Sequence, residues 1–313
     1  MTTYITGHKN PDTDATIAPI LLAFVLENLY NIKATPILQG QPNKEVRYVF
    51  KHFAVNIPEI VTAYSPEDKF YIVDTSNPQE LPDNIQEHEI LGILDHHKLA
   101  GLTTKKPVLT YIMPYGCSAT VILDYFEKNG GKIEDIPTDI QGLALSAILS
   151  DTLNLTSPTT TEYDKQYVQK LSALLNIDVD ELANNMFEAK SDVSDLSGMD
   201  IITYDAKKYE FAGTPVYVAV FETVKPENVL AKYDEIYTAL REFRKQNGFK
   251  HTLLFVVDIL NQNAYYVRYC KRSDALIKKT FDVIKETDQY FKIPGVVSRK
   301  KQIVPPLEKQ IAG

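Results

Sequence analysis

"EILGILDHH", residues 89–97, joins an apolar run directly to three consecutive titratable side chains, Asp95, His96 and His97. A short apolar run with turn residues after it is typical of a strand inside a sheet that is covered on both faces. The three polar residues would then lie at the carboxyl end of that strand. They could form a solvated turn, an acid–base group or part of a metal site.

The rest of the first half alternates in the same way. Further strand-like segments lie at 2–6, 34–39, 69–74 and 108–114, and apolar residues at helical spacing indicate helices over 14–30, 43–54, 117–129, 139–150 and 162–175. Because strands alternate with helices, the sequence predicts an α/β fold whose mainly parallel sheet has helices on both faces.

A polar stretch rich in Ser and Asp near residues 190–200 indicates a boundary between domains. A length of 313 residues also suits about two domains. We therefore expect one domain over 1–189, a linker over 190–197 and a second domain over 198–313. In the second domain, strands are expected at 215–224 and 251–260 and helices at 226–247 and 273–286.

The composition argues against nucleic-acid-binding, secreted, membrane-spanning and disulfide-rich proteins. The net charge of −8 argues against extended contact with nucleic acid. The first residues lack a signal-peptide pattern, and the longest nearly apolar run, 17–26, is too short to cross a bilayer. Two cysteines, Cys117 and Cys270, are too few for a disulfide framework and are expected as buried, reduced thiols. We expect a cytoplasmic protein with neither a membrane nor a nucleic-acid partner.

Metal-type ligands gather at four places in the chain. They are His8, Asp12 and Asp14 in "GHKNPDTDA" (7–15), Asp74 in "YIVDTSNP" (71–78), the DHH stretch itself, and Asp151 in "LSAILSDT" (145–152). Each place alone also fits a turn or a helix end. The first three, however, follow strands of the expected parallel sheet, and the carboxyl ends of such strands form one edge where sites are built.

The donor set favours two ions over one. Two imidazoles and four carboxylates exceed what a single ion needs, whereas two divalent ions could share a bridging carboxylate. Mg²⁺ prefers oxygen donors alone, so the imidazoles favour Mn²⁺, with Co²⁺ or Zn²⁺ as alternatives. Paired ions of this kind suit the hydrolysis of phosphoryl compounds.

A phosphoryl substrate also needs cationic side chains. "SRKKQ", residues 298–302, offers Arg299, Lys300 and Lys301, and Lys207 in "YDAKKYEF" lies near the start of the second domain. Arginine binds phosphate oxygens through a two-point fork. By composition alone these residues could equally be a solvated basic surface.

Six segments, in this order, resemble the family II inorganic pyrophosphatases, the manganese- or cobalt-dependent members of the DHH phosphoesterase superfamily. They are "GHKNPDTDA", "DHH", "GCSATVIL", "LSAILSDT", "DAKKYEF" and "SRKKQ", and the resemblance runs from residue 5 to about residue 305. It implies a hydrolase that splits pyrophosphate into two phosphates with a metal-bridging hydroxide as nucleophile. It further implies two Mn²⁺ or Co²⁺ ions, with Mg²⁺ accompanying the substrate.

The resemblance also implies a role for each residue. One ion would be held by His8, Asp12 and Asp74, and the other by Asp14, Asp74, His96 and Asp151. His97 would face the substrate, and Asp95 would orient the neighbouring histidine. Pyrophosphate would be bound from the second domain by Lys207, Ser298, Arg299 and Lys300. The second domain would be a smaller, mixed-sheet α/β domain, with the active site in the cleft between the domains and a homodimer formed through the first.

Two alternatives stay open at this point. An exopolyphosphatase, a nuclease or another DHH phosphoesterase would use a similar metal site. A protein that binds metal or phosphate without catalysis could share the fold. The net negative charge speaks against the nuclease.

Overall fold

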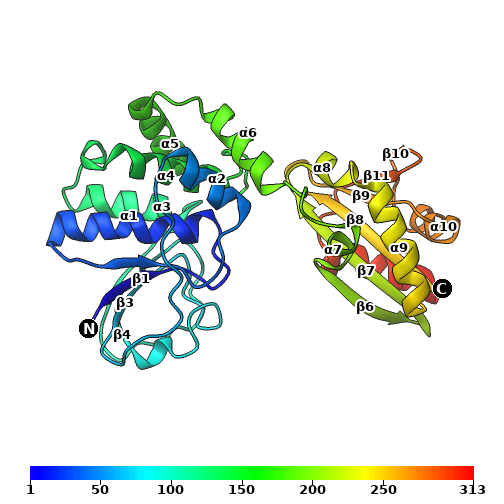
Figure 1. Cartoon of the computed structure of the whole chain (residues 1–313), viewed down its shortest axis with the longest axis horizontal. Helices are drawn as coiled ribbons and strands as arrows, with labels where there is room; N and C mark the ends of the chain where they lie inside the picture. The colour runs from blue at the N-terminus through cyan, green and yellow to red at the C-terminus, as the bar shows by residue number, and fades with distance from the viewer. The chain divides into compact units, whose positions relative to one another are not determined.

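The computed structural model describes residues 1–313, which form two compact units, 1–189 and 190–313 (Figure 1). Each unit has its own sheet. We describe the two units separately.

Strands and helices alternate as expected only over the first 52 residues, and three strands and then a run of helices follow. The elements up to residue 190 are β1 (Thr3–Thr6), α1 (Thr13–Tyr30), β2 (Thr35–Ile37), α2 (Lys44–His52), β3 (Lys69–Val73), the short 3-10 helix η1 (Ile85–Glu87), β4 (Glu89–Asp95), β5 (Leu109–Ile112), α3 (Ser118–Lys128), η2 (Ile133–Asp135), α4 (Thr138–Asp151), α5 (Glu162–Leu175) and α6 (Val179–Lys190).

The first unit is built on a five-stranded sheet in the order β2-β1-β3-β4-β5. Every neighbouring pair is parallel, which confirms the predicted parallel sheet. The carboxyl ends of all the strands therefore lie on one edge. β3 and β4, two of the three inner strands, are almost wholly buried, because each has a covered surface on both sides.

One face of this sheet is covered by helices. α1 packs against β1 and against α3 and α4 (Figure 1). By length and composition α1 could cross a membrane, but 61% of its residues are buried inside the unit, as in the central helix of a packed domain. Its N-cap, Asp12, and its left-handed C-cap, Asn31, set both ends of the helix.

The opposite face carries no helix layer, so the expectation of helices on both faces is wrong. Ile72, Ile90 and Ile93 of the sheet pack there against Leu81 and Ile85. Val61, Tyr64, Leu102 and Val108 close the same cluster from loops. Apolar side chains in irregular segments bury this face, and such segments show no helical spacing in the sequence.

The second unit contains β6 (Ala206–Phe211), β7 (Thr214–Thr223), β8 (His251–Asp258), β9 (Asn263–Val267), β10 (Lys285–Glu286) and β11 (Tyr290–Pro294), with α7 (Gly198–Thr203), α8 (Pro226–Leu230), α9 (Tyr233–Asn247), α10 (Lys271–Thr280), the π-helical turn η3 (Arg299–Ile303) and α11 (Val304–Ala312). The sheet order is β10-β11-β9-β8-β7-β6. Only β7 and β8 pair in parallel, so this is the mixed sheet that the resemblance implied.

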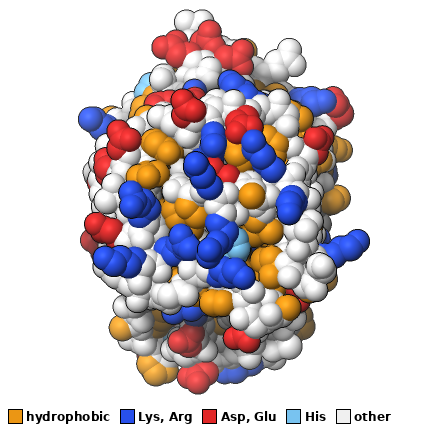
Figure 2. Space-filling view, turned by 90° about the vertical axis from the view of Figure 1, so that its right-hand side faces the viewer, with side chains coloured by type: hydrophobic (Ala, Val, Ile, Leu, Met, Phe, Trp, Pro, Cys, Tyr) orange, Lys and Arg blue, Asp and Glu red, His pale blue; other side chains and the backbone are white.

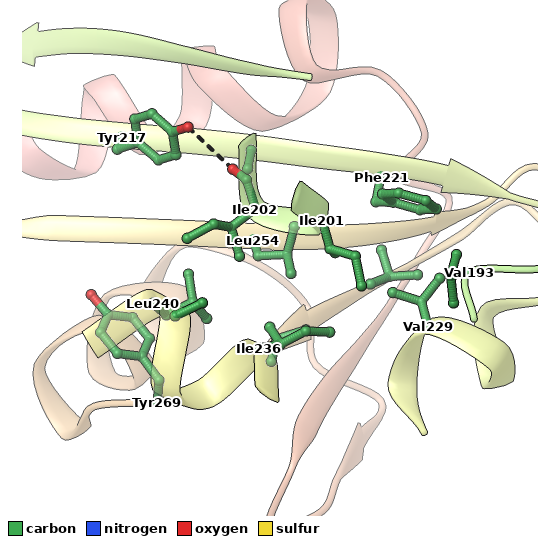
Figure 3. Close-up of a cluster of buried hydrophobic side chains, with 14 of the residues drawn as sticks. Val193, Ile201, Ile202, Tyr217, Phe221, Val229, Ile236, Leu240, Leu254 and Tyr269 are labelled. Atoms are coloured by element: carbon green, nitrogen blue, oxygen red, sulfur yellow. Dashed lines mark hydrogen bonds between the residues drawn. The ribbon is translucent and has the colours of Figure 1, made fainter. Parts of the chain in front are cut away.

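Side chains of β7 and β8 point alternately to the two faces of the sheet, and each face packs into a separate hydrophobic core. On one face Tyr217, Phe221 and Leu254 pack with Ile236 and Leu240 of α9 (Figure 3). The Tyr217 hydroxyl donates a hydrogen bond of 3.1 Å to the carbonyl of Ile202 in this cluster (Figure 3). On the other face, the intervening residues pack with side chains of α10, η3 and α11, namely Ile277, Ile303 and Leu307.

Two predicted helices end differently in the structure. The helix expected over 226–247 is two helices, α8 and α9, because the chain leaves helical geometry at Lys232, whose ammonium binds the carbonyl of Leu196. The helix expected over 273–286 stops at Thr280. Phe281 is extended, and Glu286 beyond it joins β10, where Lys278 and Arg268 form ion pairs with it. β6, β9 and β11 had no counterpart in the sequence-based prediction.

Candidate metal centre

The carboxyl ends of β1, β3 and β4 bring titratable side chains to one edge of the first sheet. The possible ligand atoms form three overlapping groups. Within each group, all the atoms lie within 4.8 Å of one another. The groups are His8, Asp12 and Asp74; Asp14, Asp74, His96 and Asp151; and Asp74, His96 and His97. All six residues that the sequence analysis assigned to metal therefore meet at this edge.

Asp74 belongs to every group and lies at the centre of the site. It follows β3 directly, its side chain is only 2% exposed, and its backbone is left-handed, with φ of 60°. Aspartate adopts this conformation more readily than most residues. The Oδ1 atom accepts a hydrogen bond of 3.0 Å from the Ser118 hydroxyl. The Asp74 carboxylate is thus held in place from outside its own strand.

His8 and Asp12 flank Asp74 on one side. The Nε2 atom of His8 lies 3.5 Å from Asp74 Oδ2 and 3.7 Å from Asp12 Oδ2. Asp12 is also the N-cap of α1, since its Oδ1 accepts a hydrogen bond of 3.0 Å from the Ala15 N–H. One oxygen of Asp12 therefore caps the helix while the other faces His8.

Asp14 and Asp151 complete the other side. The fully buried Asp14 carboxylate accepts hydrogen bonds from the backbone N–H groups of Ser118, at 2.6 Å, and Ala119, at 3.0 Å. These groups open α3, where the helix dipole favours an anion. Asp151 is the last residue of α4, and its Oδ2 lies 3.6 Å from His96 Nε2.

The orientation of His96 indicates a cation. Its Nδ1 lies 3.1 Å from the Tyr115 carbonyl, which can only accept, so Nδ1 carries a proton. Its Nε2 is buried without a hydrogen-bond partner, 3.3 Å from Asp74 Oδ1. In a neutral imidazole this Nε2 lone pair would face carboxylate oxygens, which is repulsive unless a positive charge lies between them. Histidine ligands of metals show the same arrangement of Nδ1 and Nε2.

The pKa values of the histidines and of Asp14 also indicate that the cluster needs positive charge. Burial opposes protonation of His8, yet Asp12 and Asp74 raise its pKa to about 10. Burial likewise opposes protonation of His96, but Asp74 and Asp14 raise its pKa to about 9. Burial and the charge of Asp74 raise the pKa of Asp14 to about 8. The cluster thus holds protons that a metal ion would displace on binding.

The donor chemistry fits a divalent metal. Neighbouring ligand atoms around an ion with bonds of about 2.1 Å lie about 3.0–3.5 Å apart, close to the spacings of His8 and His96 to the carboxylates. Four carboxylates with two imidazoles suit Mn²⁺ better than Mg²⁺ or a thiolate-binding metal.

His97 and Asp95 form a second pair beside this cluster. The backbone N–H of His97 donates to Asp95 Oδ1 over 2.9 Å, and His97 Nδ1 lies 3.0 Å from the same oxygen. The hydrogen bond to Asp95 raises the pKa of His97. The histidine that Asp95 orients is therefore His97, because the Tyr115 carbonyl holds His96. The His97 side chain is 53% exposed and lines a cavity of about 380 Å³ with His8 and Asp74.

The structure adds residues that the sequence analysis did not single out. Ser118 and Tyr115 hold the ligands, and Lys9, Gln79 and Glu80 line the cavity. Ser118 lies within "GCSATVIL", a segment of the resemblance to which no role was attached. The remaining histidines lie elsewhere: His52 stacks on Tyr48, His88 contacts the Asp68 carbonyl, and His251 contacts Ser273. Both cysteines are free, and Cys270 is only partly buried.

The expected substrate-binding residues all lie in the second unit. Lys207 is exposed on β6. Ser298 caps η3, since its Oγ accepts a hydrogen bond of 3.3 Å from the Lys301 N–H. Arg299 lies in η3 and pairs with Asp205 through its Nη1, at 2.8 Å from Oδ1 and 2.9 Å from the carbonyl. Lys300, in the same turn, is exposed. π-Helical turns are frequent at functional sites.

Comparison with known proteins assigns both units to described domains. The DHH family, N-terminal domain, matches residues 2–148, and the DHHA2 domain matches residues 184–310. The fold and the site therefore define a two-domain protein of the DHH and DHHA2 class.

Full-length relatives narrow this class. The chain is 35% identical to the manganese-dependent inorganic pyrophosphatase of Methanocaldococcus jannaschii, with 99% of each chain covered. It is also 35% identical to a Lactobacillus helveticus protein named "Probable manganese-dependent inorganic pyrophosphatase", again over 99% of each. A Methanococcus jannaschii crystal structure assigned to family II inorganic pyrophosphatases covers all of both chains, with a TM-score of 0.65 and 34% identity. This chain belongs to the family II, manganese-dependent inorganic pyrophosphatases.

Proposed function

We propose that this protein is an inorganic diphosphatase that hydrolyses pyrophosphate to two phosphates. The observation that carries the proposal is the buried His96 Nε2, which faces the Asp74 and Asp151 carboxylates without a hydrogen-bond partner. The full-length relatives named above favour this activity over an exopolyphosphatase or another DHH phosphoesterase.

The same site would hold two Mn²⁺ ions. His8, Asp12 and Asp74 would hold one, and Asp14, Asp74, His96 and Asp151 the other. Asp74 is the shared ligand because it alone belongs to all the ligand groups. Co²⁺ could replace Mn²⁺ at this mixed donor set, and Mg²⁺ would enter with the substrate. Bound ions would supply positive charge that lowers the pKa of water and neutralises phosphoryl oxygens.

The protein side chains contribute positioning and proton transfer. Asp95 fixes the His97 ring through Nδ1, which leaves Nε2 for a proton exchange with the phosphate that departs. Lys207, Ser298, Arg299 and Lys300 would bind the phosphate oxygens of the substrate. Phosphoryl transfer depends mainly on positioning and charge neutralisation, so the three cationic side chains would act on binding and on the transition state together.

A homodimer through the first unit, in the cytoplasm, completes the proposal. β5 is an edge strand of the first sheet, and its Leu109 is 39% exposed, so the strand could pair with a second copy. Free cysteines suit a reducing compartment. The first unit carries 25 Asp and Glu against 13 Lys and Arg, which opposes nucleic-acid contact there. Sedimentation of Leu109→Lys against wild type tests the dimer: a shift to monomer is expected.

The activity is tested by phosphate release from pyrophosphate, long-chain polyphosphate and a dinucleotide, each with Mn²⁺, Co²⁺ or Mg²⁺. Chelator-treated protein should be inactive and should recover with Mn²⁺ on pyrophosphate. Full activity of the stripped protein without any divalent ion would contradict the metal assignment. Faster release from polyphosphate than from pyrophosphate would contradict the substrate.

A further inference from the structure

A second pocket, the α9 pocket, lies in the second unit at the end of α9. Its volume is about 660 Å³, within the range of about 300–1,000 Å³ that is usual for small-molecule sites. The lining residues are Tyr237, Arg241, Arg244, Lys245, Gly248, Phe249, Tyr269 and Cys270. The pocket thus combines three cations with three aromatic rings.

The cations of the α9 pocket have no carboxylate partner. Arg241 packs on the Tyr237 ring, with its guanidinium 5.5 Å from the ring centre, and Arg244 Nε donates to the Phe249 carbonyl over 3.2 Å. Lys245 forms no ion pair. Lys128 and Lys170, in contrast, each form an ion pair with an acid. Unpaired cations around a pocket favour an anionic ligand.

More positive charge surrounds the pocket. The pKa of the nearby His251 is lowered to about 4. Burial is the main cause, and the charges of Lys250, Arg244 and Arg272 add to it. Figure 2 shows one face of the second unit, with Lys and Arg side chains gathered among apolar atoms. The second unit as a whole has 20 Lys and Arg against 16 Asp and Glu, in contrast to the acidic first unit.

The start of α10 lies beside the pocket. Cys270 lines the pocket and is the N-cap of α10, but no side chain caps this helix. The first N–H groups of a helix have no partner within it and, with the helix dipole, bind anions. The helix start therefore adds to the positive potential near the pocket, and the cationic side chains provide the phosphate contacts.

The α9 pocket is separate from the residues proposed for pyrophosphate. Phe249 and Tyr269 belong to the core on one face of the sheet, whereas Ile303, which ends η3, belongs to the core on the other face. Lys208 points to the pocket side, with its ammonium 6.0 Å from the centre of the Phe249 ring. Its neighbour Lys207 points to the opposite face, because side chains alternate along a strand.

We propose that the α9 pocket binds a nucleoside diphosphate or triphosphate. The phosphates contact Arg241, Arg244 and Lys245, and the base packs on the partly exposed Tyr237 ring. Arginine and lysine form charge-assisted bonds to phosphate. A base adds stacking on an aromatic ring, which inorganic phosphate cannot provide.

The test is calorimetric titration of metal-free, full-length protein with ADP, inorganic tripolyphosphate and adenosine. ADP should bind once per chain. Arg241→Ala with Lys245→Ala should weaken ADP binding at least about tenfold. Lys279→Ala with Lys309→Ala, which removes two exposed lysines elsewhere on the same unit, should leave it unchanged. Tyr237→Ala should weaken ADP but not tripolyphosphate, and adenosine should bind poorly.

Three results would overturn the proposal. One is the absence of ADP binding to wild type. The second is loss of ADP binding in Arg299→Ala with retention in Arg241→Ala/Lys245→Ala, which would place ADP at the pyrophosphate residues. The third is tripolyphosphate binding as tightly as ADP, which would reject the nucleotide as the ligand. Pyrophosphate hydrolysis by Arg241→Ala/Lys245→Ala, expected at the wild-type rate, tests the proposed function separately.

Discussion

The Ser118 hydroxyl donates a hydrogen bond of 3.0 Å to Asp74 Oδ1, while the backbone N–H of the same residue donates to Asp14 Oδ2 over 2.6 Å. One residue at the start of α3 therefore holds two carboxylates that come from β3 and α1. These two hydrogen bonds connect α1, α3 and the end of β3 at the candidate metal centre. They offset part of the repulsion between the Asp74 and Asp14 carboxylates.

Ser118→Ala should weaken Mn²⁺ binding about tenfold, the usual effect of losing a group that orients a ligand. Free Mn²⁺, measured by electron paramagnetic resonance during titration, gives the affinity. Ser146→Ala is the matched control, since Ser146 is equally buried but donates to the Gly142 carbonyl inside α4. Equal Mn²⁺ affinity in Ser118→Ala and Ser146→Ala would show that the hydroxyl does not position Asp74.

Asp74→Asn should lower both Mn²⁺ content and pyrophosphate hydrolysis more than Asp12→Asn does. Asp12 belongs to one ligand group, whereas Asp74 belongs to all of them. Asparagine keeps the side-chain shape and tolerates the left-handed backbone. A loss of Mn²⁺ and of hydrolysis would therefore result from the missing charge and not from misfolding. Metal content by elemental analysis decides the matter: full occupancy in Asp74→Asn would rule out a shared ligand. Asp83→Asn, an exposed acid paired with Lys9, serves as control.

Arg299→Ala should raise the KM for pyrophosphate at least about tenfold and leave Mn²⁺ content unchanged, because it would remove the proposed charge-assisted contact with phosphate. Steady-state kinetics at saturating Mn²⁺ measure the effect. Asp205→Asn serves as a comparison, because it keeps Arg299 but weakens its ion pair. Asp205 holds Arg299 at 2.8 Å, so weakening that pair should leave KM equal or lower. A loss of metal in Arg299→Ala would contradict its assignment to the substrate.

The stability of the protein should depend on pH through His251. Burial and the nearby Lys250, Arg244 and Arg272 lower its pKa in the folded state to about 4, against an unfolded value of about 6.5. The unfolded chain therefore binds the proton more readily, and the stability that neutral His251 confers is lost as the pH falls from about 6.5 towards 4. At pH 5 this loss amounts to about 2 kcal/mol.

Urea unfolding of the full chain at pH 7 and pH 5 measures this effect. His251→Gln cannot titrate, so the stability gap between wild type and this variant should shrink by about 2 kcal/mol from pH 7 to pH 5. His52→Gln removes an exposed histidine and should leave its gap unchanged. A constant gap for His251→Gln would mean that His251 is not neutral in the folded protein.

The sequence alone was sufficient for the parallel sheet of the first unit and for the residues at its edge. β4 is a short apolar run that ends on an aspartate, and β3 is one that an aspartate follows directly, which is a local signal. Parallel strands share one carboxyl edge, so the meeting of His8, Asp74 and His96 follows from topology. Their role as metal ligands stays a prediction until metal is measured.

Tertiary structure decided what no local pattern contains. The partners of the ligands, Ser118 and the Tyr115 carbonyl, lie far from them in sequence, and a backbone carbonyl has no signature in the side-chain pattern. The second face of the first sheet is buried by loop residues that lack helical or strand periodicity. The α9 pocket arises because α9, Phe249 and the start of α10 pack together. Periodicity determines which segments form elements, whereas long-range packing determines which side chains face one another across them.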